Sequence, residues 1–240
     1  MRTYFNWSGG KDSALALYHT LQAAEQKPDL LLTSVNAAVD RISMHGVRTS
    51  LLQMQADSIG IPLRKLELPE GLDMTEYNNI MRAAVTDLKA QGYGQTIFGD
   101  IFLEDLRTYR EEQLAPFGIV AQFPLWKRDT TGLLNEFLDL GFKTIVVCVK
   151  SDLLDKSFAG RVIDKEFIRD LPANVDPCGE NGEFHTFVFD GPIFKRPIDF
   201  FIGDVVYREY AKPKEDDKDN CSTGSSASQM GFWYCDLIPS

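Results

Sequence analysis

The chain has 240 residues, of which 44% are hydrophobic and 25% are charged, and its formal net charge is −10 at pH 7. This length and composition predict a soluble protein with one large domain, alone or beside a smaller one. The acidic balance argues against nucleic-acid and membrane-surface binding, which depend on clustered lysine and arginine, and no apolar run is long enough to cross a bilayer. The four cysteines have no zinc-site spacing and are predicted to be reduced thiols in the cytoplasm.

The chain opens with a strand, a glycine turn and a helix. A short apolar run precedes Ser8-Gly9-Gly10-Lys11-Asp12-Ser13, and an alanine- and leucine-rich stretch follows it. Two glycines allow several backbone N–H groups to point at one anion. The helix start adds unpaired N–H groups and the positive end of its dipole, and Lys11 adds a full charge. The stretch is therefore predicted to bind phosphate.

The loop differs from two common phosphate loops. A Walker A loop needs a glycine five residues before Gly-Lys, where this chain has Phe5, and Asp12 follows the lysine instead of a hydroxyl residue. The Gly-x-Gly-x-x-Gly dinucleotide fingerprint is absent. The remaining pattern, Ser-Gly-Gly-x-Asp-Ser, resembles the PP-loop of ATP pyrophosphatases, which cleave ATP between its α- and β-phosphates. The alternative is a strand–turn–helix junction that binds no ligand.

Apolar strand patterns and helical patterns then alternate along the chain. Strands are expected at 30–36, 63–68, 96–100, 119–123 and 143–149, and helices at 49–59, 74–91, 104–115 and through 133–138. This alternation predicts an α/β fold with a Rossmann-like, doubly wound parallel sheet.

Polar residues follow several of these strands. Asn36 and the Gly99-Asp100 pair are expected at the carboxyl ends of the strands, beside loop 8–13, where such sheets bind nucleotides. Asp12 and Asp100 are predicted to share Mg²⁺, which prefers a few carboxylates together with phosphate oxygens. Their alternative roles are a helix-start acid for Asp12 and a helix cap for Asp100.

A change of pattern suggests a second, smaller α+β domain, and we place the boundary between residues 142 and 143. Short helices are expected within 151–169, turns within 171–182 and strands after 184, the last of them at 232–237 and paired with 201–207. The charged, serine-rich segment 212–228 is predicted to be a mobile loop.

One motif in this region carries titratable groups. The stretch 178–186 reads Cys-Gly-Glu-Asn-Gly-Glu-Phe-His-Thr. Glu180 and Glu183 are candidates for binding metal, steering an amine or acting as bases, and His185 is expected to titrate near neutrality. The alternative is a solvated acidic turn with a histidine at the edge of a strand.

Taken together, these motifs resemble the diphthine–ammonia ligase family of PP-loop proteins. The resemblance rests, in chain order, on the loop 8–13, Phe98-Gly99-Asp100-Ile101, Arg107 with Arg110-Glu111, Pro124-Leu125-Trp126, and Gly179-Glu180-x-Gly182-Glu183-Phe184-x-Thr186. It implies a reaction in which ATP and Mg²⁺ activate a carboxylate, pyrophosphate leaves, and ammonia displaces AMP to give an amide. The resemblance assigns ATP to residues 8–13, with Asp100 near the nucleotide and with Glu180 and Glu183 on the acceptor side. Lys11, Asp12, Glu180, Glu183 and His185 are the candidate catalytic residues.

The acceptor carboxylate, on a small molecule or a protein side chain, is left open. Asn181, Phe184 and His185 depart from the usual Gly-Glu-Gly-Gly-Glu-Tyr-Glu-Thr, and this variant looks like a bacterial branch with a suggested role in corrinoid salvage. A corrinoid amide ligase is therefore one alternative. Others are an adenylating enzyme acting on a nucleoside or tRNA, and a nucleotide-binding module without turnover. A homodimer is also left open.

Overall fold

The computed structural model describes residues 1–23, 27–42, 45–211 and 229–240. The amino-terminal part forms a sheet in which β2, β1, β5 and β6 are neighbours in that order, and β4 pairs with β2 on the outside. The elements of this part are β1 (Arg2–Asn6), α1 (Lys11–Gln22), β2 (Leu30–Asn36), β3 (Arg41–Ile42), α2 (Thr49–Ile59), β4 (Leu63–Leu68), α3 (Met74–Ala90), β5 (Tyr93–Ile97), α4 (Glu104–Leu114), the 3-10 helix η1 (Ala115–Phe117), β6 (Val120–Gln122) and α5 (Thr130–Asp139). The predicted α/β class is confirmed.

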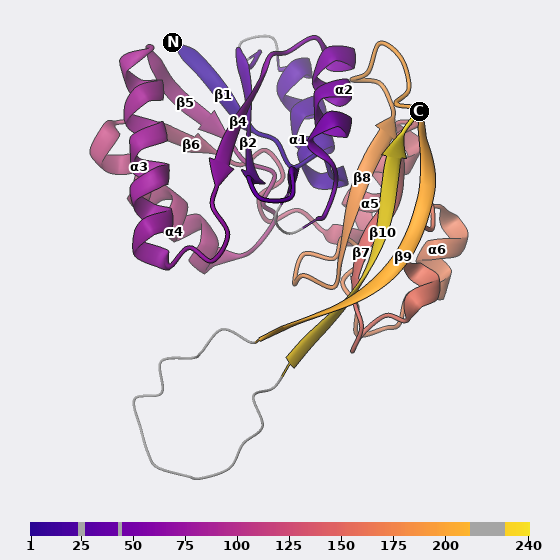
Figure 1. The fold of residues 1–240 in the computed structure, drawn as a ribbon. Coiled ribbons are helices and arrows are strands. Elements are labelled where there is room, and N and C mark those ends of the chain that lie inside the picture. Colours follow the sequence, from indigo (N-terminus) through magenta and orange to yellow (C-terminus); the bar gives the residue numbers. More distant parts are fainter. Residues whose placement is uncertain (24–26, 43–44, 212–228) are drawn as a thin grey trace.

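The pairing in this sheet is parallel wherever a helix connects the strands. Strand β1 pairs in parallel with β2 and β5, β2 with β4, and β5 with β6. The exception is β3, a two-residue strand antiparallel to the end of β2, which is too short to give a pattern in the sequence. Figure 1 shows α3 and α4 on one face of the sheet and α1 and α2 on the other.

Local signals explain where several helices begin and end. Asp73 caps α3, because its side chain accepts from the Glu76 amide while the Glu76 carboxylate accepts from the Asp73 amide, which is a capping box. Helix α2 ends at Gly60, whose φ of 80° is left-handed and suits glycine. No described helix is both long enough and apolar enough to span a membrane.

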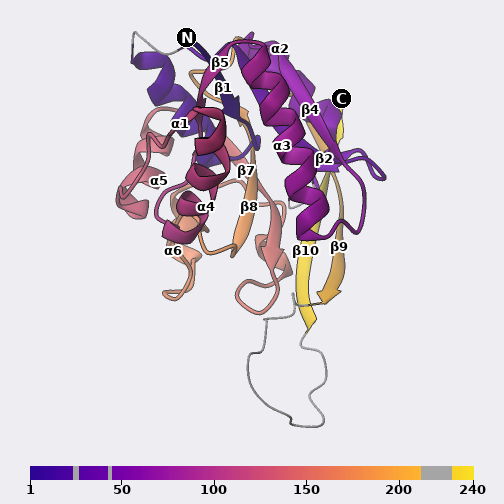
Figure 2. The same cartoon turned by 90° about the vertical axis from the view of Figure 1, so that its left-hand side faces the viewer.

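The carboxy-terminal part forms a second, antiparallel sheet in the order β8-β7-β10-β9. Its elements are β7 (Lys143–Lys150), the 3-10 helix η2 (Lys156–Phe158), α6 (Lys165–Asp170), β8 (Phe184–Asp190), β9 (Phe200–Ala211) and β10 (Gln229–Pro239). The predicted pairing of the last strand with 201–207 is confirmed by the register of β10 on β9. Figure 2 shows β7 and β8 side by side, with β9 and β10 continuing as a ribbon beyond them.

Strand β7 continues the alternating series of the first domain in sequence, although it lies on the carboxy-terminal side of the expected boundary. The structure places it in the second sheet, where it pairs antiparallel with β8 and β10. A strand buried on both faces has the same apolar pattern in a parallel as in an antiparallel sheet, so the sequence does not distinguish them. The boundary at 142 and 143 stays a prediction, and the segment 212–228, predicted to be mobile, lies outside the described residues.

The two sheets share one hydrophobic core. Phe5 of β1, Leu51 of α2, Phe137 of α5 and Phe187 of β8 are all buried in the same cluster. Helices α1 and α2 lie between the first sheet and β8 (Figure 1). The carboxyl ends of β1, β2 and β5 are thereby brought against the amino-terminal end of β8.

Candidate active site

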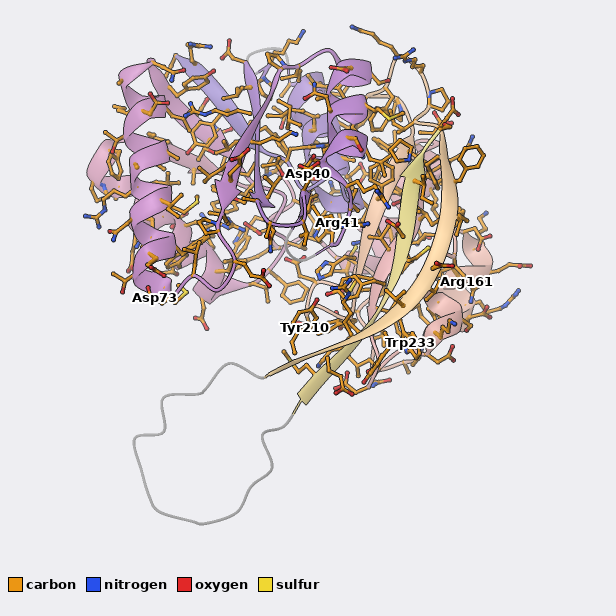
Figure 3. All side chains as sticks on the ribbon, viewed as in Figure 1. Asp40, Arg41, Asp73, Arg161, Tyr210 and Trp233 are labelled. Atoms are coloured by element: carbon orange, nitrogen blue, oxygen red, sulfur yellow. The ribbon has the colours of Figure 1, made fainter. Side chains whose placement is uncertain are left out.

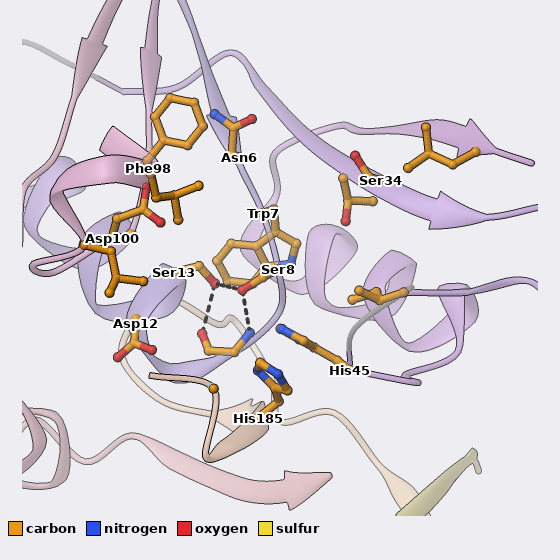
Figure 4. A pocket seen from close by; sticks show the side chains of 18 of the residues that line it. Asn6, Trp7, Ser8, Asp12, Ser13, Ser34, His45, Phe98, Asp100 and His185 are labelled. Carbon is orange, nitrogen blue, oxygen red and sulfur yellow. Dashed lines mark hydrogen bonds between the residues drawn. The ribbon is translucent and has the colours of Figure 1, made fainter. Parts of the chain in front are cut away.

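A pocket of about 1180 Å³ lies where the two sheets meet. It is lined by the loop 8–13 apart from Gly9, by the carboxyl ends of β2 and β5, by the amino-terminal ends of α3 and α4, and by most of the segment 178–186. Figure 4 shows Ser8, Asp12 and Ser13 around the turn, with Asp100 on one side and His45 and His185 on the other. The structure thus brings together the separate motifs singled out in the sequence.

The loop 8–13 has the turn that its glycines predict. Gly9 has a φ of 76°, a left-handed value that glycine adopts readily. The Ser8 hydroxyl donates to Ser13 Oγ at 3.0 Å and accepts from the Gly10 amide at 3.3 Å, while Ser13 Oγ donates to the Gly10 carbonyl at 2.9 Å (Figure 4). The N-cap of α1, Gly10, has no side-chain capping bond. The amides of Gly10 and Lys11 are bonded to Ser8 and Thr186, so the amides of Asp12 and Ser13 are the ones that this helix start offers to an anion.

Strand β8 packs directly against this loop, which the sequence did not predict. The Val188 amide donates to the Gly9 carbonyl at 2.9 Å, and the Lys11 amide donates to Thr186 Oγ1 at 3.0 Å. A Cβ placed on Gly10 would lie 3.1 Å from the Thr186 carbonyl oxygen. Gly10 has an extended backbone that any residue adopts, so a glycine at this position is explained by the close approach of β8.

The side chain of Gln55, on α2, connects the loop 8–13 to β8 through hydrogen bonds. This side chain is fully buried, donates to the carbonyls of Gly9 at 3.1 Å and Val188 at 2.6 Å, and accepts from the Trp7 indole N–H at 2.9 Å. In the sequence it is one polar residue inside an amphipathic helix. The only signal in the sequence was the position of this glutamine on the apolar face of the predicted helix.

We expect Gln55→Leu to lower the free energy of unfolding by about 1–3 kcal/mol, because the Trp7 N–H and the Val188 carbonyl would be left buried without this partner. Thermal unfolding measures the loss. Gln53→Leu is the matched control, because Gln53 is exposed on the same helix and bonds Asp57 at the surface. Equal melting temperatures for the two variants would show that the buried network contributes nothing.

Lys11 is buried at the base of the pocket, with 4% of its surface exposed. Its ammonium donates to Asp12 Oδ2 at 2.7 Å and also to the Cys178 carbonyl. Burial opposes the charge, but the attraction of Asp12 and of Glu180 outweighs it, so the pKa of Lys11 is raised. Lys11 is therefore a fixed positive charge held between the loop and the second sheet.

Three carboxylates gather on one side of this lysine. Burial is the main cause that raises the pKa of Asp12, Asp100 and Glu180. For Glu180 the value reaches about 7, with the nearby charges of Asp12 and Asp100 adding to the effect. A bound cation would relieve this repulsion between half-buried acids.

The donor set fits Mg²⁺ in the way the sequence suggested. The described residues contain no cluster of three or more ligating side chains that could hold a metal by themselves. Mg²⁺ is commonly held by one or two carboxylates plus substrate phosphates, and Asp12 and Asp100 can supply those. Asp100 Oδ2 makes no well-aligned hydrogen bond among the described residues, but it already has a cationic neighbour in Arg110 Nε, so Mg²⁺ would share this carboxylate with an ion pair.

Asp100 forms an ion pair that was not predicted from the sequence. Arg110 of α4 pairs with it, with Nε 2.8 Å from Oδ2 and Nη2 donating to Oδ1 at 3.2 Å. The guanidinium also lies over the Phe98 ring at 4.3 Å. Gly99 lets this strand end approach α1, because a Cβ there would lie 3.0 Å from the Ser13 amide nitrogen.

The two glutamates of the late motif have different surroundings. Glu180 lines the pocket and accepts from the Ile101 amide at 2.8 Å. Glu183 does not line it and is 2% exposed. Its carboxylate accepts from the Asp176 amide at 3.0 Å, and from the Asn181 amide and side chain at 2.9 and 3.1 Å. The structure therefore differs from the expectation that both face the acceptor, because Glu183 holds together the turn that presents Glu180.

His185 lines the pocket but has an unexpected partner. Its ring stacks on that of His45, with centroids 4.5 Å apart and planes at 21°. Burial lowers the pKa of His185 to about 4, and Lys11 adds to the effect. His185 is therefore neutral at pH 7, instead of titrating there as the sequence suggested.

Asn36 also lines the pocket, and its side chain accepts from the Ala38 amide at 2.9 Å.

Two family models match the chain over most of its length. The diphthamide synthase N-terminal domain matches residues 1–118, and the diphthamide synthase C-terminal domain matches residues 129–212. The second match includes β8 and the motif 178–186. Both halves of the pocket thus fall within matched regions.

Individual proteins give the same result at low identity. A diphthine–ammonia ligase of Danio rerio is 25% identical over 214 residues, which cover 80% of this chain and 83% of that protein. The Homo sapiens protein of the same name is 24% identical over 222 residues, covering 83% and 82%. The Schizosaccharomyces pombe protein is 27% identical over 222 residues, 83% of this chain but 36% of its own length.

Proposed function

Because the chain belongs to the diphthamide synthase family, whose relatives are ligases, we propose that it joins a carboxylate to ammonia at the expense of ATP. In this reaction the carboxylate attacks the α-phosphate of ATP and pyrophosphate leaves. Ammonia then attacks the acyl carbon of the adenylate. The N–C bond forms, the C–O bond to AMP breaks with its electron pair leaving on AMP, and one nitrogen proton is released.

The observation that carries this proposal is the joining of an anion-binding loop and an acidic cluster in one pocket. The start of α1 and Lys11 suit phosphate groups, and Asp12 and Asp100 suit the Mg²⁺ that accompanies them. A volume of about 1180 Å³ is more than most single small ligands need. It leaves room for an acceptor beside a nucleotide.

Positively and negatively charged residues of the pocket have different roles in this proposal. Lys11 and the N–H groups at the start of α1 would stabilise the negative charge that develops on the departing pyrophosphate. Mg²⁺ would neutralise phosphate charge and hold the oxygens in place. Glu180, with its pKa raised to about 7, is suited to take the proton released from nitrogen, since a base works best near the operating pH.

The products test this reaction class. We expect ATP to be converted to AMP and pyrophosphate when Mg²⁺, ammonium and a diphthine-bearing protein are present, because the loop lacks the Walker A pattern. Chromatography of the nucleotide measures the outcome, and omission of ammonium is the control for amide formation. Accumulation of ADP would contradict the proposal.

The names of the relatives indicate which acceptor to test first. All the relatives reported above are named diphthine–ammonia ligase, so diphthine is the first acceptor to test. Nothing found favours the corrinoid or nucleoside alternatives. The family usually has an acid at the position of His185. His185 is neutral at pH 7, so the acceptor of this chain would meet an uncharged side chain there.

A further inference from the structure

The pocket has a second polar wall that the roles above leave unused. It consists of His45, from the segment between β3 and α2, and His185 of β8, both of which line the pocket. Their rings stack with centroids 4.5 Å apart, and Figure 4 shows the pair beside the turn that carries Ser8. His45 Nδ1 is buried and has no hydrogen bond among the described residues, although buried polar atoms normally have one.

Both imidazoles are uncharged at neutral pH. Burial lowers the pKa of His45 well below its usual value, and His185 and Lys11 lower it further, which together outweigh the opposite effect of a hydrogen bond to the Ser8 backbone. The pKa of His185 falls to about 4 for similar reasons. A neutral imidazole carries one N–H donor and one lone-pair nitrogen. The wall therefore offers hydrogen bonds without a charge.

The charges around the loop decide what such a wall can receive. An acceptor carboxylate has to approach the phosphate-binding turn to be activated. Glu180, which the proposed Mg²⁺ site does not use, would repel it in its charged form. The histidine wall carries no negative charge and lies in the positive field of Lys11, so it does not repel an acyl oxygen in this way.

The wall is also held in place before any ligand binds. Arg41 donates to the Gly46 carbonyl at 2.6 Å, which closes the segment that carries His45. Asp236 of β10 accepts from Arg41 at 2.8 Å and from Arg48 at 2.6 Å. Figure 3 shows Arg41 at the junction between the two sheets. Such support is what a precise binding group requires.

We propose that the stacked His45–His185 pair is the subsite for the acyl oxygen of the adenylated acceptor, an inference that rests on the proposed ligase function. One N–H of the pair donates to that oxygen as a neutral group, and the donation strengthens when ammonia attacks and negative charge develops there. Neutral imidazoles with lowered pKa values polarise carbonyl groups in this way. The nucleotide itself is held by the loop, so the pair contributes to the acyl group alone.

Two uncleavable mimics separate these contributions. Sulfamoyl adenosine carries the nucleotide part, and acetylsulfamoyl adenosine adds an acyl oxygen. We expect the wild-type protein to bind the acetylated mimic about tenfold more tightly in calorimetry, a difference of ~1.4 kcal/mol. His45→Phe keeps a flat ring for stacking but removes the hydrogen bond. Acetylation also makes the sulfamoyl nitrogen acidic, so the acetylated mimic carries a negative charge that Lys11 attracts in both proteins. The variant should therefore lower the ratio severalfold relative to the wild-type protein without changing the affinity for sulfamoyl adenosine.

His19→Phe is the matched control, because His19 is the remaining histidine of the chain and does not line the pocket. In the wild-type protein, the ring-nitrogen NMR signals of His45 should shift with the acetylated mimic only. An unchanged ratio in both His45→Phe and His185→Phe would overturn the inference, as would equal losses for both mimics. If the wild-type protein bound neither mimic, the proposed ligase function itself would fail.

Discussion

Lys11→Ala is expected to weaken ATP binding at least tenfold, or by about 1.4 kcal/mol. Lys11 is the buried cation beside the anion-binding turn, and its ammonium is 2.7 Å from Asp12. Without it, Asp12 would remain as a half-buried acid beside the phosphates, with no cation paired to it. Both the lost attraction and the new repulsion therefore oppose ATP. Titration calorimetry with ATP and Mg²⁺ measures the change.

Lys143→Ala is the matched control for this experiment. Lys143 also pairs with an aspartate, Asp190, at 2.9 Å, but it is exposed and far from the turn in sequence. It should leave the affinity unchanged. Melting curves establish the temperature range in which the Lys11 variant is folded, and unchanged ATP affinity within that range would show that the phosphates bind elsewhere.

The second large effect concerns the two glutamates of the segment 178–186. Glu183→Gln should lower the free energy of unfolding by about 1–3 kcal/mol, because an amide N–H₂ would face N–H donors that now point at a carboxylate. The midpoint of thermal unfolding should fall by several degrees. Glu180→Gln keeps an oxygen for the Ile101 amide and removes a charge near Asp12 and Asp100, so it should not destabilise the protein.

Amide formation should show the opposite order. Glu180→Gln removes the proposed base and should slow amide formation on the order of a hundredfold. Glu183→Gln should retain more activity than Glu180→Gln at temperatures where it is folded. The two variants carry the same chemical change three positions apart, so each is the control for the other. A Glu183→Gln protein that is as stable as the wild type but inactive would show that Glu183 takes a direct part in the reaction.

The features that could be predicted from the sequence are local ones. Loop 8–13 combines its glycines, its lysine and a helix start within six residues, and the order of strand and helix follows from apolar periodicity. The convergence of Asn36 and Asp100 on that loop follows from a general property of parallel sheets. These expectations need no knowledge of how distant segments pack.

The remaining features depend on contacts between distant segments. Gln55 reads as one polar residue of an amphipathic helix until Trp7, Gly9 and Val188 are placed around it. The pKa of His185 depends on burial and on Lys11, and neither is visible from the residues that flank it. A glutamate that binds substrate and one that binds its own backbone look alike in sequence.

The contact between β8 and the phosphate loop has a consequence for the order of folding. The loop closes within a few residues, but its partner Thr186 lies 175 positions further along the chain. Contacts between such distant positions must overcome a large loop-closure entropy, and they form slowly. A chain that has assembled only its parallel sheet would have the glycine turn without the strand that fixes it. Competence to bind nucleotide would therefore arise at a late stage of folding, when the two sheets come together.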